Sequence, residues 1–249
     1  MTKPPFLQRL LRRPSPEAVG AAEVAAFAVD LAFAAMLLAF AVDRYAPPQD
    51  LAWKPFSLNE PLGLATASKL QRARSDPAAC RAALTAGGVA FREAERRETG
   101  FCSTANTVRL GSGSRLAPAG PTMTCPLALT YALWSRQVAQ PAARALLGAE
   151  IRTVDHLGTY ACRTIYGRPG ARPSQHATAG ALDVAGFHLS DGRRITVARR
   201  FRDPGPEGRF LRVTRGGACS LFGATLGPDY NVAHADHLHL DMSRYSLCR

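Results

Sequence analysis

The amino-acid sequence predicts an α+β protein in which a helical N-terminal part packs on a mainly antiparallel sheet, preceded by one transmembrane helix. Three observations support this fold class. An apolar run of 19 residues lies near the N-terminus, at 24–42. Helix-type spacing of apolar residues then dominates up to residue 147, and alternating strand-type runs dominate after it. Helices followed by strands are typical of an α+β domain.

The N-terminal apolar run, residues 24–42, carries a single charge, Asp30. About 20 mostly apolar residues suffice to cross the hydrocarbon core of a membrane. Four basic residues precede the run: Lys3, Arg9, Arg12 and Arg13. The positive-inside rule therefore predicts a cytoplasmic tail at 1–23, a signal anchor at 24–42, and a periplasmic or extracytoplasmic location for the rest of this single-pass inner-membrane protein.

Two other interpretations of this run stay open. Ala39-Phe40-Ala41 resembles a small-x-small cleavage site, so a signal peptide cut after Ala41 is an alternative. A run of 19 apolar residues is long for a signal peptide and favours an uncleaved anchor. A buried core helix is the third interpretation.

The composition limits the classes of partner. Of the 249 residues 47% are hydrophobic, which is enough to build a core and argues against a disordered protein. The formal net charge of +12 favours anionic neighbours, such as acidic lipid headgroups or an acidic cell-wall polymer. The arginines are scattered and no nucleic-acid motif is present, so we expect no nucleic-acid partner.

The cysteines indicate an oxidising compartment. They are even in number, widely spread and contain no CxxC pair, which disfavours zinc fingers and thioredoxin-like sites. Such a set predicts disulfides in an exported protein, although the sequence does not choose their pairing. The six are Cys80, Cys102, Cys125, Cys162, Cys219 and Cys248.

Beyond the anchor we expect a linker at 43–63, rich in Pro and polar residues, and one domain at 64–249. Periodicity predicts helices at 65–74, 77–84, 126–147 and 210–221, with a kink or break at Pro141. Alternation predicts strands at 151–162, 180–189, 194–198 and 234–242.

Two histidine motifs predict a metal site. His176 and Asp183 lie seven residues apart in SQHATAGALDVAGF, separated mostly by small residues. In His237-Leu238-His239, strand geometry places both imidazoles on one face. Catalytic zinc takes three nitrogen or oxygen ligands from the protein and leaves one position for water. His176, Asp183 and one histidine of the pair would supply that set.

These motifs also carry a family resemblance. SQHATAGALD resembles the SxHxxGxAxD motif of zinc D-Ala-D-Ala peptidases, and DHLH resembles their closing D/E-x-x-H. The arrangement is similar to that of the wider LAS group, which includes the hedgehog-like fold. With CPLAL, TYACR and HADHLHLD added, the segment from about residue 64 to 249 resembles the bacterial extensin-like protein C-terminal domain.

The resemblance implies roles for individual residues. It makes His176, Asp183 and His239 the ligands of a Zn²⁺ cofactor. Further roles follow for four residues: Asp236 as acidic general base, His237 as catalytic or outer-sphere histidine, Arg163 as the substrate-binding and oxyanion-stabilising arginine, and Ser174 as a residue that orients a ligand. One departure is Ala179, which stands where the motif has glycine. A left-handed backbone at this position would be strained.

The resemblance and the motifs together predict a membrane-anchored, exported zinc metallopeptidase-like protein. Its expected reaction is hydrolysis of amide bonds in peptidoglycan peptides, as a D,D-carboxypeptidase or an endopeptidase. The alternatives are a catalytically silent zinc-containing module that binds the cell wall, and a purely structural envelope protein. Among the other polar residues, His156 and His234 are weighed between cleft and surface, and Asp241 is expected to pair with an arginine such as Arg244.

Overall fold

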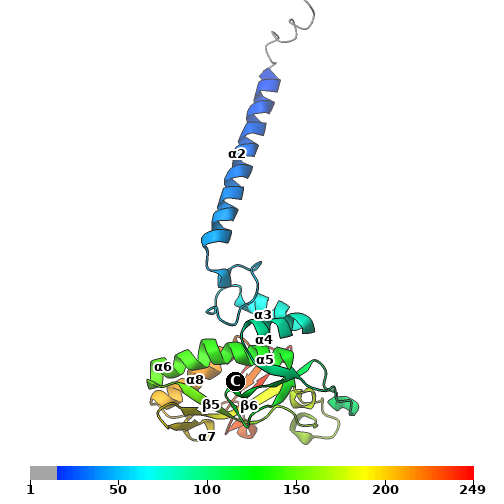
Figure 1. Ribbon diagram of the computed structural model, residues 1–249, viewed down its shortest axis with the longest axis vertical. Coiled ribbons are helices and arrows are strands. Elements are labelled where there is room, and N and C mark those ends of the chain that lie inside the picture. Colours follow the sequence, from blue (N-terminus) through cyan, green and yellow to red (C-terminus); the bar gives the residue numbers. More distant parts are fainter. Residues whose placement is uncertain (1–15) are drawn as a thin grey trace, which may run out of the picture. The chain divides into compact units, whose positions relative to one another are not determined.

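The computed structural model describes residues 16–249 and divides into two units at Pro47 (Figure 1). The first unit contains one helix, α2 (Pro16–Tyr45). Its segment Glu23–Tyr45 is long and apolar enough to cross a membrane, and its large apolar side chains are exposed. This exposure argues against the core-helix interpretation and leaves a membrane anchor or a signal sequence. Most of the predicted basic tail lies outside the described residues.

The second unit, residues 48–249, is an α+β domain, as predicted. Its main sheet has the strand order β10-β8-β9-β6-β5-β3, and β7 pairs with β6. Only the outer pairs β10/β8 and β3/β5 are parallel, so the sheet is mainly antiparallel. The strands are β3 (Leu116–Ala117), β5 (Ile151–Gly158), β6 (Ala181–Leu189), β7 (Arg194–Thr196), β8 (Ala224–Leu226), β9 (Leu238–Asp241) and β10 (Leu247–Cys248).

The predicted helices are present with shifted ends. They are α3 (Thr66–Ser75), α4 (Pro77–Ala86), α5 (Cys125–Trp134), α6 (Gln140–Leu147) and α8 (Pro206–Cys219), with a short α7 (Val197–Arg200) in addition. The irregularity expected near Pro141 is a π-helical turn, Ser135–Ala139, which joins α5 to α6. Pro141 itself lies in the first turn of α6, where the backbone N–H that proline lacks would have no partner within the helix.

The core lies between the sheet and helices α5, α6 and α8. Trp134 of α5 packs against Phe187 of β6 with 6.3 Å between ring centroids, and Phe187 meets Phe210 of α8 edge-on at 5.0 Å. The indole Nε1 of Trp134 donates to the Thr214 carbonyl oxygen at 2.9 Å, so this buried polar group is satisfied. Figure 1 shows these helices gathered on one side of β5 and β6.

Strand alternation places the polar residues on the other face of the sheet. Leu182 and Val184 of β6, and Leu238 and Leu240 of β9, are fully buried in the core. Because successive side chains in a strand point to opposite faces, the residues between them face away from the helices. The helix-covered core thus fixes where the polar positions of β6 and β9 point.

Several elements differ from the sequence expectation. A small antiparallel sheet, β1-β2-β4, was not anticipated, because its strands are short. The strand expected at 234–242 begins only at Leu238, and residues Val232–His234 form a 3₁₀ turn, η7. The strand expected at 194–198 ends at Thr196, where α7 begins. The strands of the small sheet are β1 (Phe91–Glu93), β2 (Thr107–Leu110) and β4 (Thr122–Thr124).

Most of the expected linker packs on the domain. Leu51 and Leu58 are buried, and Gln137 Nε2 donates to the Leu58 carbonyl oxygen at 2.9 Å. The ammonium of Lys69 in α3 donates to the Pro48 carbonyl oxygen at 2.7 Å. Residues 48–63 therefore belong to the second unit, because two leucines among the prolines supply core contacts.

All six cysteines form disulfides, as the even and dispersed set predicted. The bonds are Cys80–Cys125, Cys102–Cys162 and Cys219–Cys248. The first joins α4 to α5, the second fixes the chain after β5, and the third ties the end of α8 to β10.

Candidate metal centre

A tight turn presents His176. Residues Gln175–Thr178 form the 3₁₀ helix η6, and the Ser174 hydroxyl accepts the backbone N–H of His176 at its start. The turn closes with the N–H of Ala179 on the His176 carbonyl and the N–H of Gly180 on the Gln175 carbonyl. This pair of bonds is a Schellman motif, which requires a left-handed residue at its end. Ala179 takes that left-handed conformation, with φ of 56°, so the strain expected at this position of the motif is present.

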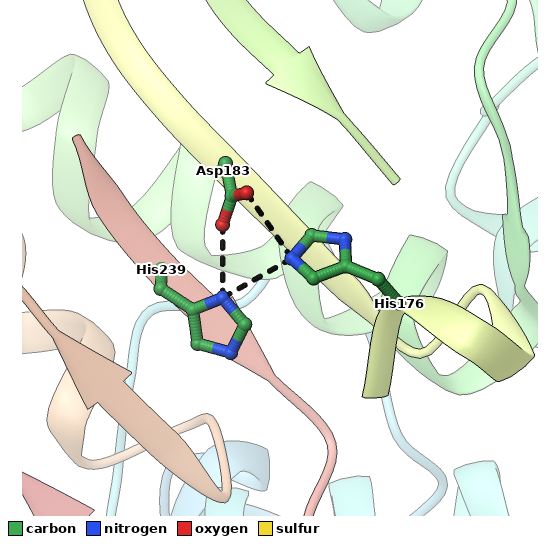
Figure 2. Close-up of side chains that lie close together, drawn as sticks. All are labelled: His176, Asp183 and His239. Carbon is green, nitrogen blue, oxygen red and sulfur yellow. Dashed lines mark hydrogen bonds and ion pairs between the residues drawn. The ribbon is translucent and has the colours of Figure 1, made fainter. Parts of the chain in front are cut away.

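Asp183 and His239 are directly opposite each other on neighbouring strands. The β6/β9 register pairs them, and both point away from the helix-covered core. Their spacing is therefore set by the sheet, while η6 brings His176 to the same place from the turn before β6. Figure 2 shows the three side chains converging from two strands and one turn.

The distances among these three residues suit a tetrahedral metal ion. His176 Nε2 lies 3.2 Å from His239 Nδ1 and 3.1 Å from Asp183 Oδ2, and His239 Nδ1 lies 2.8 Å from Asp183 Oδ1 (Figure 2). Ligand atoms about 2.0–2.1 Å from a tetrahedral zinc ion lie about 3.3 Å from one another. The three ligand atoms of the group all lie within 4.8 Å.

The outer nitrogens of both histidines are held by hydrogen-bond acceptors. His176 Nδ1 donates to the Thr159 carbonyl oxygen at 3.3 Å, and His239 Nε2 donates to Asp241 Oδ2 at 3.1 Å. Neither acceptor has a proton to give, so in the neutral rings these nitrogens carry the hydrogen. The facing nitrogens then present lone pairs to each other and to Asp183. Three converging lone pairs need a cation between them.

Charge in the site points the same way. Burial by itself lowers the pKa of His239. The hydrogen bonds to Asp183 and Asp241 outweigh this effect and raise the pKa to about 9. Burial raises the pKa of Asp183, and hydrogen bonds with His176 and His239 outweigh this and bring it well below its usual range. The group therefore favours a positive charge at its centre, which a proton or a divalent cation supplies.

His237 and Asp236 lie beside the three ligands as a hydrogen-bonded pair. His237 Nδ1 lies 2.8 Å from Asp236 Oδ1, and its Nε2 lies 3.6 Å from Asp183 Oδ1. His237 is buried, whereas the Asp236 side chain is 65% exposed. The carboxylate thus holds the ring, and the ring's other nitrogen faces the metal centre.

His234 belongs to the site as well. It is buried, and its ring lies 5.2 Å from that of His237 and 5.7 Å from that of His239. Its Nδ1 is 2.8 Å from Asn231 Oδ1, and Asn231 Nδ2 donates to the Tyr166 hydroxyl at 2.8 Å. Burial, followed by the charges of His239 and His237, lowers the pKa of His234 to about 4, so the ring is neutral near pH 7.

Arg163 lies in the exposed loop after β5, next to the disulfide partner Cys162. Its carbonyl oxygen accepts the backbone N–H of Ser174 at 3.1 Å, which joins this loop to the turn that carries His176. Its charge is the last of the causes that lower the pKa of His234, after burial and the charges of His239 and His237.

The structure thus brings most of the expected site residues together. His176, Asp183 and His239 form the centre, with His237 and Asp236 beside them. Asp241 does not pair with Arg244: it receives the His239 ring instead, because both project from β9 on the same face. His156 lies elsewhere on β5, its Nε2 2.8 Å from the Pro118 carbonyl oxygen. Thr159, a backbone acceptor, was missed because its role leaves no side-chain signal in the sequence.

Comparison with known proteins gives one family. The family described as Extensin-like protein C-terminus matches residues 78–249, more than two thirds of the chain. The match covers every residue of the metal centre. Comparison with curated proteins and with solved structures returned no match.

Proposed function

Starting from the fact that this chain belongs to the extensin-like protein C-terminal family, we propose that it is a zinc-dependent amide hydrolase of cell-wall peptides. One observation carries the proposal. Two histidine nitrogens and one carboxylate converge at distances of 2.8–3.2 Å, and the far nitrogen of each histidine is fixed by an acceptor. Catalytic zinc sites use three such ligands and hold their histidines in this way.

The number of protein ligands favours a catalytic site over a closed structural site. Among the described residues, the group whose ligand atoms lie within 4.8 Å contains only His176, Asp183 and His239. His237 stands outside this group, with its Nε2 facing the site. Structural zinc sites are closed by four protein ligands, whereas catalytic sites keep one position open.

The chain's own groups divide the work of hydrolysis. A bound zinc ion would polarise the scissile carbonyl and lower the pKa of water in the open position. His237, whose Nδ1 is held by Asp236, would accept a proton from the attacking water at Nε2 and return it to the leaving amine. In this proposal His237 is the base, and Asp236, which the resemblance implied as the base, orients its ring. Arg163 supplies positive charge for the carbonyl oxygen of the substrate.

The N-terminal helix and the cysteines support a location of the reaction outside the cytoplasm. Glu23–Tyr45 is long enough to act as an anchor, and three disulfides suit an oxidising compartment. We place the domain outside the cytoplasm, attached to the inner membrane through residues 24–42. Its substrate there is peptidoglycan, whose peptides contain the amide bonds that such a centre cuts.

The test measures metal content and turnover of the purified full chain in detergent. We expect about one zinc per chain, lost in His176→Ala and retained in His188→Ala, whose side chain pairs with Asp155 away from the centre. Peptidoglycan digestion should release D-Ala or separate cross-linked peptides, in a reaction that a chelator stops. Release of D-Ala identifies a carboxypeptidase, and separated cross-links identify an endopeptidase.

Other outcomes decide against the proposal in different ways. Stoichiometric zinc without turnover would contradict the hydrolase and favour the catalytically silent zinc-containing module. Loss of zinc in neither variant, or no zinc in the wild type, would contradict a metal centre at His176.

A further inference from the structure

A pocket lies apart from the candidate metal centre. It has a volume of about 600 Å³ and opens between the end of α3, the start of α5 and the chain that follows β9. None of the three metal ligands lines it. Two arginines, Arg74 and Arg244, face it, and we call it the arginine pocket.

The charge of the arginine pocket is one-sided. Arg74 and Arg244 are its charged residues, and none of the described residues that line it is Asp or Glu. Arg74 is partly buried, and this burial lowers the pKa of its guanidinium. A partly buried cation without a carboxylate beside it is costly, and an anionic ligand would offset that cost.

Arg74 is also held in a fixed orientation. Its Nη1 donates to the Leu221 carbonyl oxygen at 3.0 Å, and its Nε and Nη2 donate to Gln71 Oε1 at 3.0 and 2.7 Å. These bonds fix the guanidinium and leave further N–H groups for a ligand. A fixed guanidinium loses little entropy when it binds an oxyanion.

The amide side chains of the pocket are oriented as donors. Gln71 Oε1 accepts from Arg74, and Asn106 Oδ1 accepts from Arg81 Nη1 at 2.9 Å. The NH₂ group of each amide is therefore the part that remains for a ligand. Arginines and amide NH₂ groups together form a wall rich in donors, which suits a ligand rich in acceptor oxygens.

We propose that the arginine pocket binds a short peptide through its free carboxylate. Planar guanidinium groups pair with a carboxylate in a bidentate way, and amide donors suit the carbonyl oxygens of a peptide backbone. A volume of about 600 Å³ accommodates a ligand of a few residues. Gln175 and Thr178 line the pocket and flank His176 in η6, so a bound peptide contacts the element that carries a metal ligand.

The test measures peptide binding by the full chain in detergent, with a chelator present so that neither zinc nor hydrolysis is required. The probe is N-acetyl-D-Ala-D-Ala as the free acid, and isothermal titration calorimetry measures its affinity for the protein. We expect the free acid to bind and its C-terminal amide to bind at least about tenfold more weakly, because a charge-assisted bond is lost. Arg74→Gln and Arg244→Gln should each lower the affinity for the free acid by about tenfold or more.

Matched controls separate this site from general electrostatics. Arg199→Gln removes the same charge from an exposed position outside the pocket and should leave binding unchanged. Arg244 is itself exposed, so its replacement tests the pocket without disturbing the bonds that Arg74 makes. The proposal would be overturned if the acid and the amide bound with equal affinity, or if Arg199→Gln weakened binding as much as the pocket variants do. It would also be overturned if inorganic phosphate occupied the pocket at lower concentrations than the peptide does. None of these results depends on whether the metal centre hydrolyses amides.

Discussion

Asp241 accepts a hydrogen bond from His239 Nε2 and so fixes Nδ1 as the nitrogen that faces His176 and Asp183. In Asp241→Asn, an amide replaces the carboxylate that receives His239 Nε2. The ring then loses its fixed tautomer and part of its basicity, so we expect zinc affinity to fall by about 10–100-fold. Competition with a chromophoric chelator measures this change in the full chain. Asp229→Asn, a half-exposed carboxylate outside the centre, is the control, and equal losses in both variants would contradict the role of Asp241.

Ala179 combines left-handed strain with a fully buried methyl group. In Ala179→Gly, relief of the strain, about 1 kcal/mol, opposes the loss of that methyl, about 0.8 kcal/mol. We therefore expect the free energy of unfolding to change by less than about 1 kcal/mol. Ala179→Val adds bulk and a branched Cβ to the same turn and should cost about 2 kcal/mol or more.

Urea unfolding in detergent, followed by tryptophan fluorescence, measures both Ala179 variants. Trp134 in the core provides the signal. A gain of more than about 2 kcal/mol in Ala179→Gly would show that the buried methyl contributes nothing. The same measurement on zinc-loaded and chelated samples shows whether the strain in η6 affects the metal centre.

Residue spacing predicted His176, Asp183 and one histidine of the His237–His239 pair, and the family resemblance selected His239. His176 and Asp183 stand at a fixed separation, and the register of β6 with β9 places His239 opposite Asp183. The partners behind them could not be predicted in the same way. His234 reaches the cluster through a 3₁₀ turn, and Asp241 has the same strand phase whether it binds a histidine or an arginine. Tertiary contacts decide between such alternatives.

At the scale of elements, periodicity located the long segments and missed the short ones. Helix α5 and strand β6 carry strong apolar patterns because both lie in the core. The strands of the β1-β2-β4 sheet are three or four residues long, too short for a pattern to emerge. Residues 48–63 resemble a linker in composition, and the burial of Leu51 and Leu58 reveals their attachment.

The three disulfides connect different layers and differ in exposure. Cys80 and Cys125 are both fully buried, whereas Cys162 and Cys248 are exposed. Thiol–disulfide exchange requires access of the attacking thiolate, so under native conditions Cys102–Cys162 and Cys219–Cys248 should open before Cys80–Cys125. Timed reduction with dithiothreitol, alkylation and peptide mass spectrometry give the order. In urea all three should open together, and early opening of Cys80–Cys125 without urea would contradict its burial.

The Cys102–Cys162 bond also positions the loop that carries Arg163. Cys162 precedes Arg163, and the Arg163 carbonyl oxygen accepts the N–H of Ser174 at the start of the His176 turn. One covalent bond and one hydrogen bond therefore hold the chain on both sides of the metal centre. In the proposed function, the element that would contact the substrate is thereby tied to the element that would supply a metal ligand.

At the scale of the whole molecule, the charge around the apolar segment predicts which side of a membrane the domain would occupy. Lys3, Arg9, Arg12 and Arg13 precede the segment, whereas Asp43 and Arg44 end it. By the positive-inside rule, we expect this asymmetry to keep the N-terminus in the cytoplasm and to export residues 48–249. We expect proteinase K to digest the domain in intact spheroplasts of a bacterial host, while a cytoplasmic marker protein survives.

The same preparation separates an anchor from a signal peptide. A retained anchor gives a membrane-bound chain of full mass, because the long apolar run stays in the bilayer. Cleavage after Ala41 would instead release a soluble chain that begins at Val42, and intact mass spectrometry distinguishes the two. If the domain resists proteinase K until the spheroplasts are lysed, it lies in the cytoplasm. The wall peptides proposed as its substrate would then be out of reach, so this single result bears on the function as well as the topology.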